Sequence, residues 1–279
     1  MGIKICITQL FNNTELFFQR MSNNSKILPL DLVNVSHSIN GMRYIKDVNL
    51  RLRTNVTTMI LGPNGAGKSL LLRICHGLTT PSQGKVTFLG PSGVQPRNHQ
   101  AMVFQKPIML QRSVMGNMEF ALRSQKTPKT SRVLLIKEIL ETIGLSRLSK
   151  ISARELSTGE QQRLAIGRAW ALKPEILFLD EPTANLDPAA THVVEQIIGK
   201  IKESGTTIVM STHDLSQARR LADEILFLYR GRVLENSSAK EFFSGPKNDL
   251  AQSFLKGELL WWHRQKLKPP SKKNIKIIK

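Results

Sequence analysis

Leu61-Gly62-Pro63-Asn64-Gly65-Ala66-Gly67-Lys68-Ser69 is the stretch that decides the fold of this chain. It fits the pattern G-x-x-x-x-G-K-[ST], which is typical of a phosphate-binding loop. The run Thr57–Leu61 before it is β-branched and apolar, which predicts a buried strand. The apolar run Leu70–Cys75 after it favours a helix that packs on a sheet. Strand, glycine-rich turn and helix in this order are the context that the pattern requires.

The residue types in this loop suit the binding of phosphate groups. The glycines let the backbone curl so that its N–H groups point at an anion, and the following helix adds its positive end. Lys68 can reach the β- and γ-phosphates of a nucleotide, and the Ser69 hydroxyl can bind Mg²⁺. The expected nucleotide-binding residues are Gly62, Pro63, Asn64, Gly65, Ala66, Gly67, Lys68 and Ser69. From this stretch alone, a chance match in an ordinary turn remains the alternative.

The composition limits the class of protein. With 279 residues, 41% of them hydrophobic, the chain can bury a core as one large domain or two small ones. No apolar segment approaches the ~20 residues of a membrane span, and the first residues lack the pattern of a signal peptide. The two cysteines, Cys6 and Cys75, are too few for a disulfide framework or a zinc site, so we expect a reducing, cytosolic location.

The net charge of +19 comes from 40 Lys and Arg against 21 Asp and Glu. Such a balance is typical of proteins that bind nucleic acid or an anionic membrane, and also of proteins with a solvated, lysine-rich surface. Residues 261–279 contain Arg264, six lysines and no acidic residue. Because no nucleic-acid recognition motif accompanies this tail, we favour a solvated or membrane-proximal tail and expect no nucleic-acid partner.

The chain divides into three expected parts. Residues 1–26 show no periodicity and are interpreted as a poorly ordered extension, with Met21 as the hypothetical true start. Residues 27–242 form the main α/β domain, which includes a helical subdomain at about 106–172. Residues 243–279 are expected to form a C-terminal helix, packed onto the core by Phe254, Leu255, Leu259 and Trp261, and a basic tail.

Within the main domain, the order of patterns predicts an α/β fold with a mainly parallel sheet. Leu30–Val35 and Val48–Leu52 alternate as antiparallel strands, and Asn40-Gly41 between them is a hairpin signal. The further strands are expected at 85–89, 101–104, 176–180, 206–210, 224–229 and 232–234, and helices at 132–143, from Asp187 to Gly205, and at 215–222. The fold class is therefore a P-loop (RecA-like) core with an N-terminal antiparallel β-subdomain and an inserted α-helical subdomain.

The pair Asp180-Glu181 follows an apolar strand, which is where a phosphate-loop enzyme needs carboxylates. Asp180 can hold the Mg²⁺ that Ser69 also contacts, and Glu181 can polarise the attacking water. The plainer alternative is a surface acidic pair in a turn.

Taken together, residues 30–234 resemble an ATP-binding cassette (ABC) ATPase subunit. The resemblance rests on the Walker A loop Gly62–Ser69, the Q-loop residue Gln105, the signature Leu156-Ser157-Thr158-Gly159-Glu160, the Walker B run Ile176–Glu181, the D-loop Ala184–Asp187 and the switch residue His213. These motifs occur in the order of that family.

The resemblance implies a mechanism and partners. Two subunits would face each other head to tail, with ATP between the Walker A loop of one and Ser157 and Gly159 of the other. His213 would contact the γ-phosphate beside the catalytic Glu181. Gln105 would sense Mg²⁺ and link the site to the helical subdomain, which in the family docks onto a membrane permease.

Three positions depart from the family pattern. Thr158 stands where glycine is usual, and Glu160 stands where glutamine is frequent and places negative charge near the triphosphate. Ile39 stands where an aromatic residue stacks on adenine, so we hypothesise weak adenine packing and relaxed selectivity for the base.

Ala101–Pro107, Phe242–Pro246 and Ala251–Trp261 are similar to tungstate-type oxyanion importer ATPases, with phosphate importers as close relatives. This resemblance implies a peripheral subunit on the inner face of the cell membrane, working with separate permease subunits and a solute-binding protein outside. An exporter or lipid-handling ATPase, or one acting on nucleic acid or ribosomes, remains the alternative. The sequence does not identify the solute, because other subunits bind it.

Overall fold

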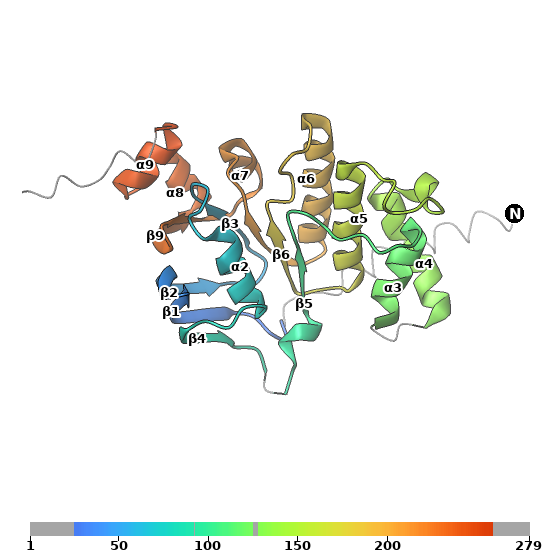
Figure 1. The fold of residues 1–279 in the computed structure, drawn as a ribbon, viewed down its shortest axis with the longest axis horizontal. Helices are drawn as coiled ribbons and strands as arrows, with labels where there is room; N and C mark the ends of the chain where they lie inside the picture. Colours follow the sequence, from blue (N-terminus) through green and yellow to red (C-terminus); the bar gives the residue numbers. More distant parts are fainter. Residues whose placement is uncertain (1–24, 92, 125–127, 259–279) are drawn as a thin grey trace, which may run out of the picture.

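The computed structural model describes residues 25–91, 93–124 and 128–258, which form two sheets and the helices that cover them (Figure 1). The hypotheses on Met21 and on the basic tail lie outside the described residues, as do Cys6, Leu259 and Trp261. Among the described helices, none combines the length and the apolar character needed to cross a bilayer.

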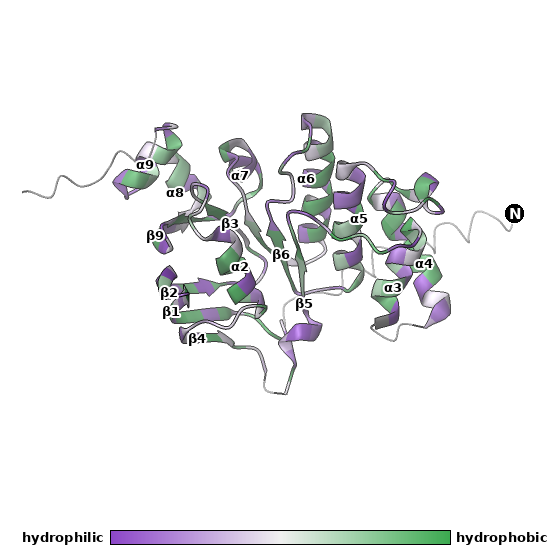
Figure 2. Ribbon diagram, in the orientation of Figure 1, coloured by the Kyte–Doolittle hydropathy of each residue, from purple (hydrophilic) through white to green (hydrophobic). Residues whose placement is uncertain are grey.

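The larger sheet holds the strand that precedes the phosphate loop. Its order is β5-β6-β7-β3-β8-β9, and only β9 runs antiparallel to its neighbour. The strands are β3 (Thr57–Leu61), β5 (Gln100–Val103), β6 (Ile176–Asp180), β7 (Thr207–Ser211), β8 (Glu224–Tyr229) and β9 (Arg232–Ser238). Every residue of β3, β6 and β7 is buried, as expected for parallel strands covered on both faces. The predicted mainly parallel sheet is therefore confirmed, and Figure 2 shows β3 and β6 as hydrophobic strands at its centre.

The smaller sheet is antiparallel and has the order β2-β1-β4, with β1 (Leu30–Ile39), β2 (Met42–Leu52) and β4 (Gln83–Phe88). The predicted hairpin turn at Asn40-Gly41 is confirmed, with φ values of 51° and 79° that fit a two-residue type I′ turn. Both hairpin strands are longer than predicted, because their exposed ends lack the apolar alternation that marks a strand in a sequence.

Helix α2 (Lys68–His76) lies between the two sheets (Figure 1). Its Leu71, Leu72 and Cys75 join residues of both sheets in one hydrophobic core. Cys75 is fully buried in this core, and burial raises the pKa of its thiol to about 12. A second core lies on the other face of the larger sheet, where α5 (Thr158–Ala171) and α6 (Pro188–Glu203) pack.

The stretch between β5 and β6 is helical, with α3 (Val114–Ser124), α4 (Lys129–Thr142) and α5. Helix α3 had no counterpart among the expected elements. Helix α4 begins three residues earlier than predicted, because its exposed first turn carries no apolar signal. Asp187 caps α6 as expected, with its side chain accepting a hydrogen bond from the backbone N of Ala190.

The chain continues through α7 (Leu215–Leu221), α8 (Ala239–Ser244) and α9 (Asp249–Leu255). The rings of Phe254 and Phe227 have centroids 5.3 Å apart, and Leu255 is partly buried against the same core. The expected packing of the C-terminal helix is confirmed for these two residues.

Candidate active site

The phosphate loop joins β3 to α2, and close backbone approaches shape it. Gly62 has φ of 150°, and a Cβ there would lie 2.0 Å from the carbonyl O of Leu228 in β8. Gly67 caps α2 with φ of 105°. Only glycine allows these conformations at such close range, which is the physical reason for these two positions of the motif.

The loop is also hydrogen-bonded to both sheets through one turn residue. The N of Gly231, between β8 and β9, donates to the O of Ala66 at 2.9 Å, and its own O accepts from the N of Lys46 in β2 at 2.8 Å. A Cβ on Gly231 would lie 2.0 Å from the O of Tyr44. The phosphate loop, the β1–β2 hairpin and the β8–β9 turn are thus held together by backbone contacts.

Lys68 is 5% exposed, and oxygen atoms surround its ammonium group. Its Nζ donates to the carbonyl O of Gly62 at 3.0 Å and to that of Pro63 at 3.4 Å. It also lies 3.3 Å from Oε1 of Glu181. The cation is therefore placed in the mouth of the loop, where phosphate oxygens can take over from the oxygens that now accept from it.

Asp180 is the last residue of β6 and is 4% exposed. Its Oδ1 accepts a hydrogen bond from Ser69 Oγ and another from Ser211 Oγ, each at 2.8 Å. Carboxylate and hydroxyl oxygens are the ligands that Mg²⁺ prefers, and Mg²⁺ in nucleotide sites takes most other ligands from water and phosphate. The donor set of Ser69 and Asp180 therefore fits Mg²⁺. Within residues 25–91, 93–124 and 128–258, no cluster of three His, Cys, Asp or Glu residues could hold a metal by itself.

Glu181 and His213 complete the set of polar side chains beside the phosphate loop. The Oε2 of Glu181 lies 3.3 Å from Nδ1 of His213, and a carboxylate can only accept, so this nitrogen carries the hydrogen. His213 is exposed, at the edge where parallel strands end. Two of the expected catalytic residues are thus in contact with each other and, through Glu181, with Lys68.

The structure does not bring Gln105 into this network. Val103 pairs with Leu179, so Gln105 and Asp180 both follow the same edge of the sheet. The Gln105 side chain is exposed, and no hydrogen bond within the described ranges joins it to Ser69 or Asp180. Its predicted role in metal sensing stays a prediction.

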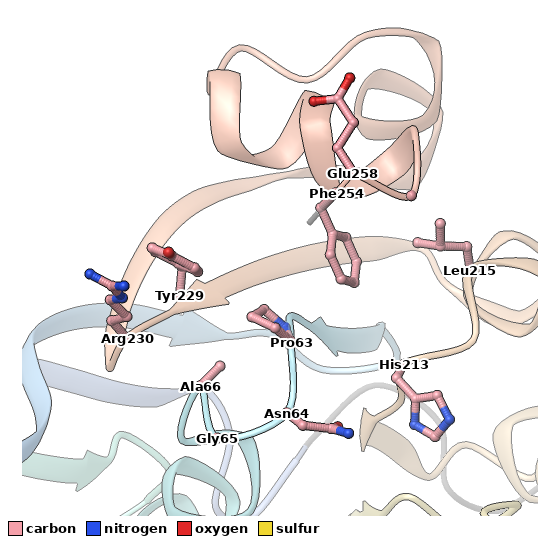
Figure 3. Close-up of a pocket in the computed structure, with 11 residues that line it drawn as sticks. Pro63, Asn64, Gly65, Ala66, His213, Leu215, Tyr229, Arg230, Phe254 and Glu258 are labelled. Carbon is pink, nitrogen blue, oxygen red and sulfur yellow. The ribbon is translucent and has the colours of Figure 1, made fainter. Parts of the chain in front are cut away.

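An open pocket of about 610 Å³ lies beside the phosphate loop. In Figure 3, Asn64 and His213 lie at its lower side, while Phe254 points into it from α9 above. Tyr229 and Arg230, from the end of β8, form another wall. The loop therefore has open space on the side that faces His213.

The residues Ser157 and Gly159 line a different pocket of about 520 Å³, together with Asn185 to Asp187 and the start of α6. A Cβ on Gly159 would lie 3.2 Å from Cβ of Ala190, so a larger residue would press on α6. This pocket has no lining residue in common with the pocket beside the phosphate loop. One copy of the chain therefore presents the two halves of the expected nucleotide site apart from each other.

Ser157 and Glu160 form a capping box at the start of α5. The Oε2 of Glu160 accepts from the N of Ser157 at 2.9 Å and from its Oγ at 2.7 Å. These two hydrogen bonds from Ser157 lower the pKa of the Glu160 carboxyl. The carboxylate thus folds back on the serine, and Thr158 is the exposed first residue of the helix.

At the hairpin, Ile39 is 45% exposed and Tyr44 is 43% exposed. The backbone O of Tyr44 would lie 3.5 Å from a Cβ on Gly67, so this part of the hairpin adjoins the start of α2. An exposed aliphatic side chain at 39 offers no ring face for stacking.

Two features were not predicted as parts of the site. Ser211 contacts both Asp180 and Glu181, although only its place at the end of a buried strand was visible in the sequence. Asn117, fully buried in α3, accepts from Arg168 of α5 at 3.0 Å, and Arg168 also donates to the O of Ile108. This second contact ties the segment after Gln105 to the signature helix, and burial lowers the pKa of the Arg168 guanidinium.

Comparisons with known proteins agree with this geometry. Residues 45–184 match the family model described as ABC transporter. The chain is 36% identical over 261 residues to the phosphate import ATP-binding protein PstB of Mycoplasmoides gallisepticum, covering 88% of this chain and 80% of that protein. It is 38% identical over 209 residues to the tungstate uptake system ATP-binding protein TupC of Peptoclostridium acidaminophilum, covering 75% and 98%.

Among solved structures, cbiO1 of Clostridium perfringens, part of the ABC transporter complex cbiONQ, superposes with a TM-score of 0.70 at 27% identity. The match covers 82% of this chain and 96% of that one. The chain is thus similar to importer ATPases of more than one type. The match to the phosphate type is longer, at 261 residues, than the match to the tungstate type, at 209 residues.

Proposed function

Because the chain belongs to the ABC transporter ATPase family, we propose that it binds and hydrolyses ATP as the energising subunit of an importer. The observation that carries this proposal is the convergence of Lys68, Glu181 and His213 beside the pair Ser69 and Asp180. A cation, a carboxylate base, an imidazole and a pair of oxygen ligands at one loop are the groups that phosphoryl transfer to water needs.

Each side chain has a separate task in this proposal. Lys68 and the loop N–H groups bind the β- and γ-phosphates and neutralise their charge. Glu181 accepts a proton from the attacking water, and His213 donates to it and keeps its carboxylate oriented. Ser69 and Asp180 would hold Mg²⁺, which supplies charge stabilisation for the leaving phosphate oxygens.

The proposed working unit is a dimer of identical chains. Ser157 and Gly159 lie in their own pocket, away from the phosphate loop of the same chain. A second copy turned head to tail would bring its Ser157 and its α5 N-terminus to the γ-phosphate, where N–H groups and the helix dipole favour an anion. The two open pockets would then close on each other.

The proposed partners are integral membrane permease subunits, with an external solute-binding protein acting indirectly. The subunit would lie peripherally on the inner, cytoplasmic face of the membrane. The solute class is an inorganic oxyanion, supported by relatives named for phosphate import and tungstate uptake. The exporter, lipid-handling and nucleic-acid alternatives find no support in these relatives.

Two variants test the reaction. Glu181→Gln should bind a fluorescent ATP analogue normally and lose turnover, because the amide cannot accept the proton of water. Lys68→Ala should lose nucleotide affinity first, because the loop then lacks its full positive charge. Loss of ATP binding in Glu181→Gln would show that this carboxylate is structural and would contradict the proposal.

A deletion strain tests the solute. Uptake of radiolabelled phosphate and of tungstate is measured with and without the gene, and re-expression of the Glu181→Gln variant serves as the control for turnover. Loss of neither uptake would contradict the oxyanion class.

A further inference from the structure

Ser211 is the last residue of β7, fully buried, and it pairs with Asp180 in the sheet. Its Oγ lies 2.8 Å from Oδ1 of Asp180 and 3.0 Å from the backbone N of Glu181. One hydroxyl group therefore contacts both members of the carboxylate pair.

The direction of these hydrogen bonds follows from the partners. The N–H of Glu181 can only donate, so the Ser211 oxygen accepts from it. The hydroxyl hydrogen is then left for Asp180 Oδ1, which accepts. The serine hydroxyl thus connects a backbone donor to a carboxylate acceptor, and its one hydrogen is used in the bond to Asp180.

The backbone at Glu181 needs this support. Its φ is 44°, in the left-handed region that non-glycine residues seldom adopt. Its N–H meets the hydroxyl of Ser211 and, at 3.2 Å, the carbonyl O of Ser211. This turn aims the Glu181 side chain at Lys68 and His213.

Asp180 also needs a second donor for a chemical reason. At present Ser69 and Ser211 both donate to its Oδ1. If the oxygen of Ser69 becomes a ligand of Mg²⁺, it gives a lone pair to the metal and can keep its hydrogen for Asp180, but the metal then sets the position of this donor. Ser211 is fully buried, and it is the donor to Asp180 whose position the sheet alone sets.

We propose that Ser211 is a positioning residue that orients Asp180 toward the metal and fixes Glu181 beside it. This inference rests on the proposed function of the same site. Ligands are commonly oriented by such outer hydrogen bonds, whose loss typically costs about 10- to 100-fold in metal affinity or activity.

The test compares Ser211→Thr with Ser211→Val, which have nearly the same shape and differ in the hydroxyl. Binding of Mn²⁺ to the full chain with ATP is followed by electron paramagnetic resonance, and binding of ATP in EDTA is measured by competition with a fluorescent analogue. Ser211→Val should weaken Mn²⁺ binding about 10- to 100-fold while ATP binding in EDTA changes little, and Ser211→Thr should restore most of the Mn²⁺ affinity. If the valine variant does not fold, Ser211→Ala carries the same expectation without added volume.

Thr207→Val is the matched control on the same strand. Thr207 is 1% exposed, and its Oγ1 accepts from the N of Asn55. It starts β7 and lies about 13 Å from Ser211, at ~3.3 Å per strand residue. Its loss should lower the melting temperature but leave Mn²⁺ affinity unchanged.

Three results would overturn the inference: wild-type Mn²⁺ affinity in Ser211→Val, equal losses in the threonine and valine variants, or the same loss in Thr207→Val. These differ from failure of the proposed function, in which the wild-type chain itself would bind neither ATP nor Mn²⁺ with ATP.

Discussion

Glu160→Gln should strengthen ATP-driven dimerisation, because it removes an anion beside the proposed contact with the partner's γ-phosphate. Glutamine can keep the capping geometry, since its amide oxygen accepts from the N and Oγ of Ser157 as the carboxylate does. The carboxylate oxygen lies 2.7 Å from Ser157 Oγ. A phosphate oxygen that takes over the one hydrogen of this hydroxyl would lie about 5 Å from that carboxylate oxygen, given a contact of ~2.7 Å on each side of Oγ.

At that distance, two unit charges repel by about 1 kcal/mol in water. A symmetric dimer contains the contact twice, so we expect a gain of about 2 kcal/mol, or roughly 30-fold in the dissociation constant of the dimer. The gain should shrink in ~1 M salt, where the Debye length is about 3 Å.

The assay is sedimentation equilibrium with ATP and Mg²⁺, in a Glu181→Gln background that prevents turnover. Ser238 and Glu241 form a second capping box at the start of α8 with similar geometry, so Glu241→Gln is the matched control. It should change helix capping in the same way and leave dimerisation unchanged. Equal dimerisation of the Glu160→Gln variant and its parent, or an equal gain from Glu241→Gln, would refute the reasoning.

Three further predictions follow from single features. Gly62→Ala should lower the melting temperature and abolish ATP binding, because its Cβ would lie 2.0 Å from the O of Leu228. Gly65→Ala should do less harm, because it strains a backbone with φ of 76° but its Cβ meets no atom beyond its chain neighbours within 4 Å; equal effects in thermal unfolding and ATP titration would contradict this. Competition binding should show less than about tenfold preference for ATP over GTP, since Ile39 offers no ring to stack on a base. Stacking of a base on an aromatic ring is worth roughly 1–3 kcal/mol. A strong preference for ATP would count against this role of Ile39. The capping box of Glu160 should stabilise the fold above the unfolded carboxyl pKa of about 4.3 and lose this effect as the pH falls through the lower folded pKa. The free energy of unfolding should therefore depend less on acid pH in Glu160→Gln than in the wild type. Equal pH dependence in both chains would show that the cap contributes nothing.

The parts of the fold that the sequence predicted are those with a strong local pattern. The buried strands β3, β6 and β7 are short apolar runs, and the order of strands and helices places their carboxyl ends together. Asp180 ends such a strand, and Lys68 and His213 follow the loop or turn after one, so their convergence could be expected.

Helix α3 shows why a real pattern can be overlooked. Val114, Met118 and Leu122 are buried at a spacing of four, which is a helical stripe. Gly116 and Asn117 interrupt it, and both are weak helix formers. In the structure, the Asn117 side chain bonds to the backbone of the preceding segment and to Arg168, a tertiary role that helix propensity does not contain.

Ser211 shows the same limit in the site. Its two partners lie 31 and 30 positions away in the chain and become neighbours only through the pairing of β6 with β7. A serine at the end of an apolar strand has many possible partners, and the register of the sheet selects among them. Gln105 is the opposite case, because its expected role depends on a bound nucleotide and no contact within the described residues replaces it.

The two backbone hydrogen bonds of Gly231 limit which parts of the molecule can move relative to each other. Its N and O reach Ala66 and Lys46, so the phosphate loop, the hairpin and the β8–β9 turn share main-chain bonds that no side-chain rotation can release. If the small sheet moved relative to the phosphate loop, these hydrogen bonds would have to break in every cycle. We therefore expect the nucleotide-binding loop and the small sheet to move as one rigid body, and the segments around Ser157 and Arg168 to be the parts that change position.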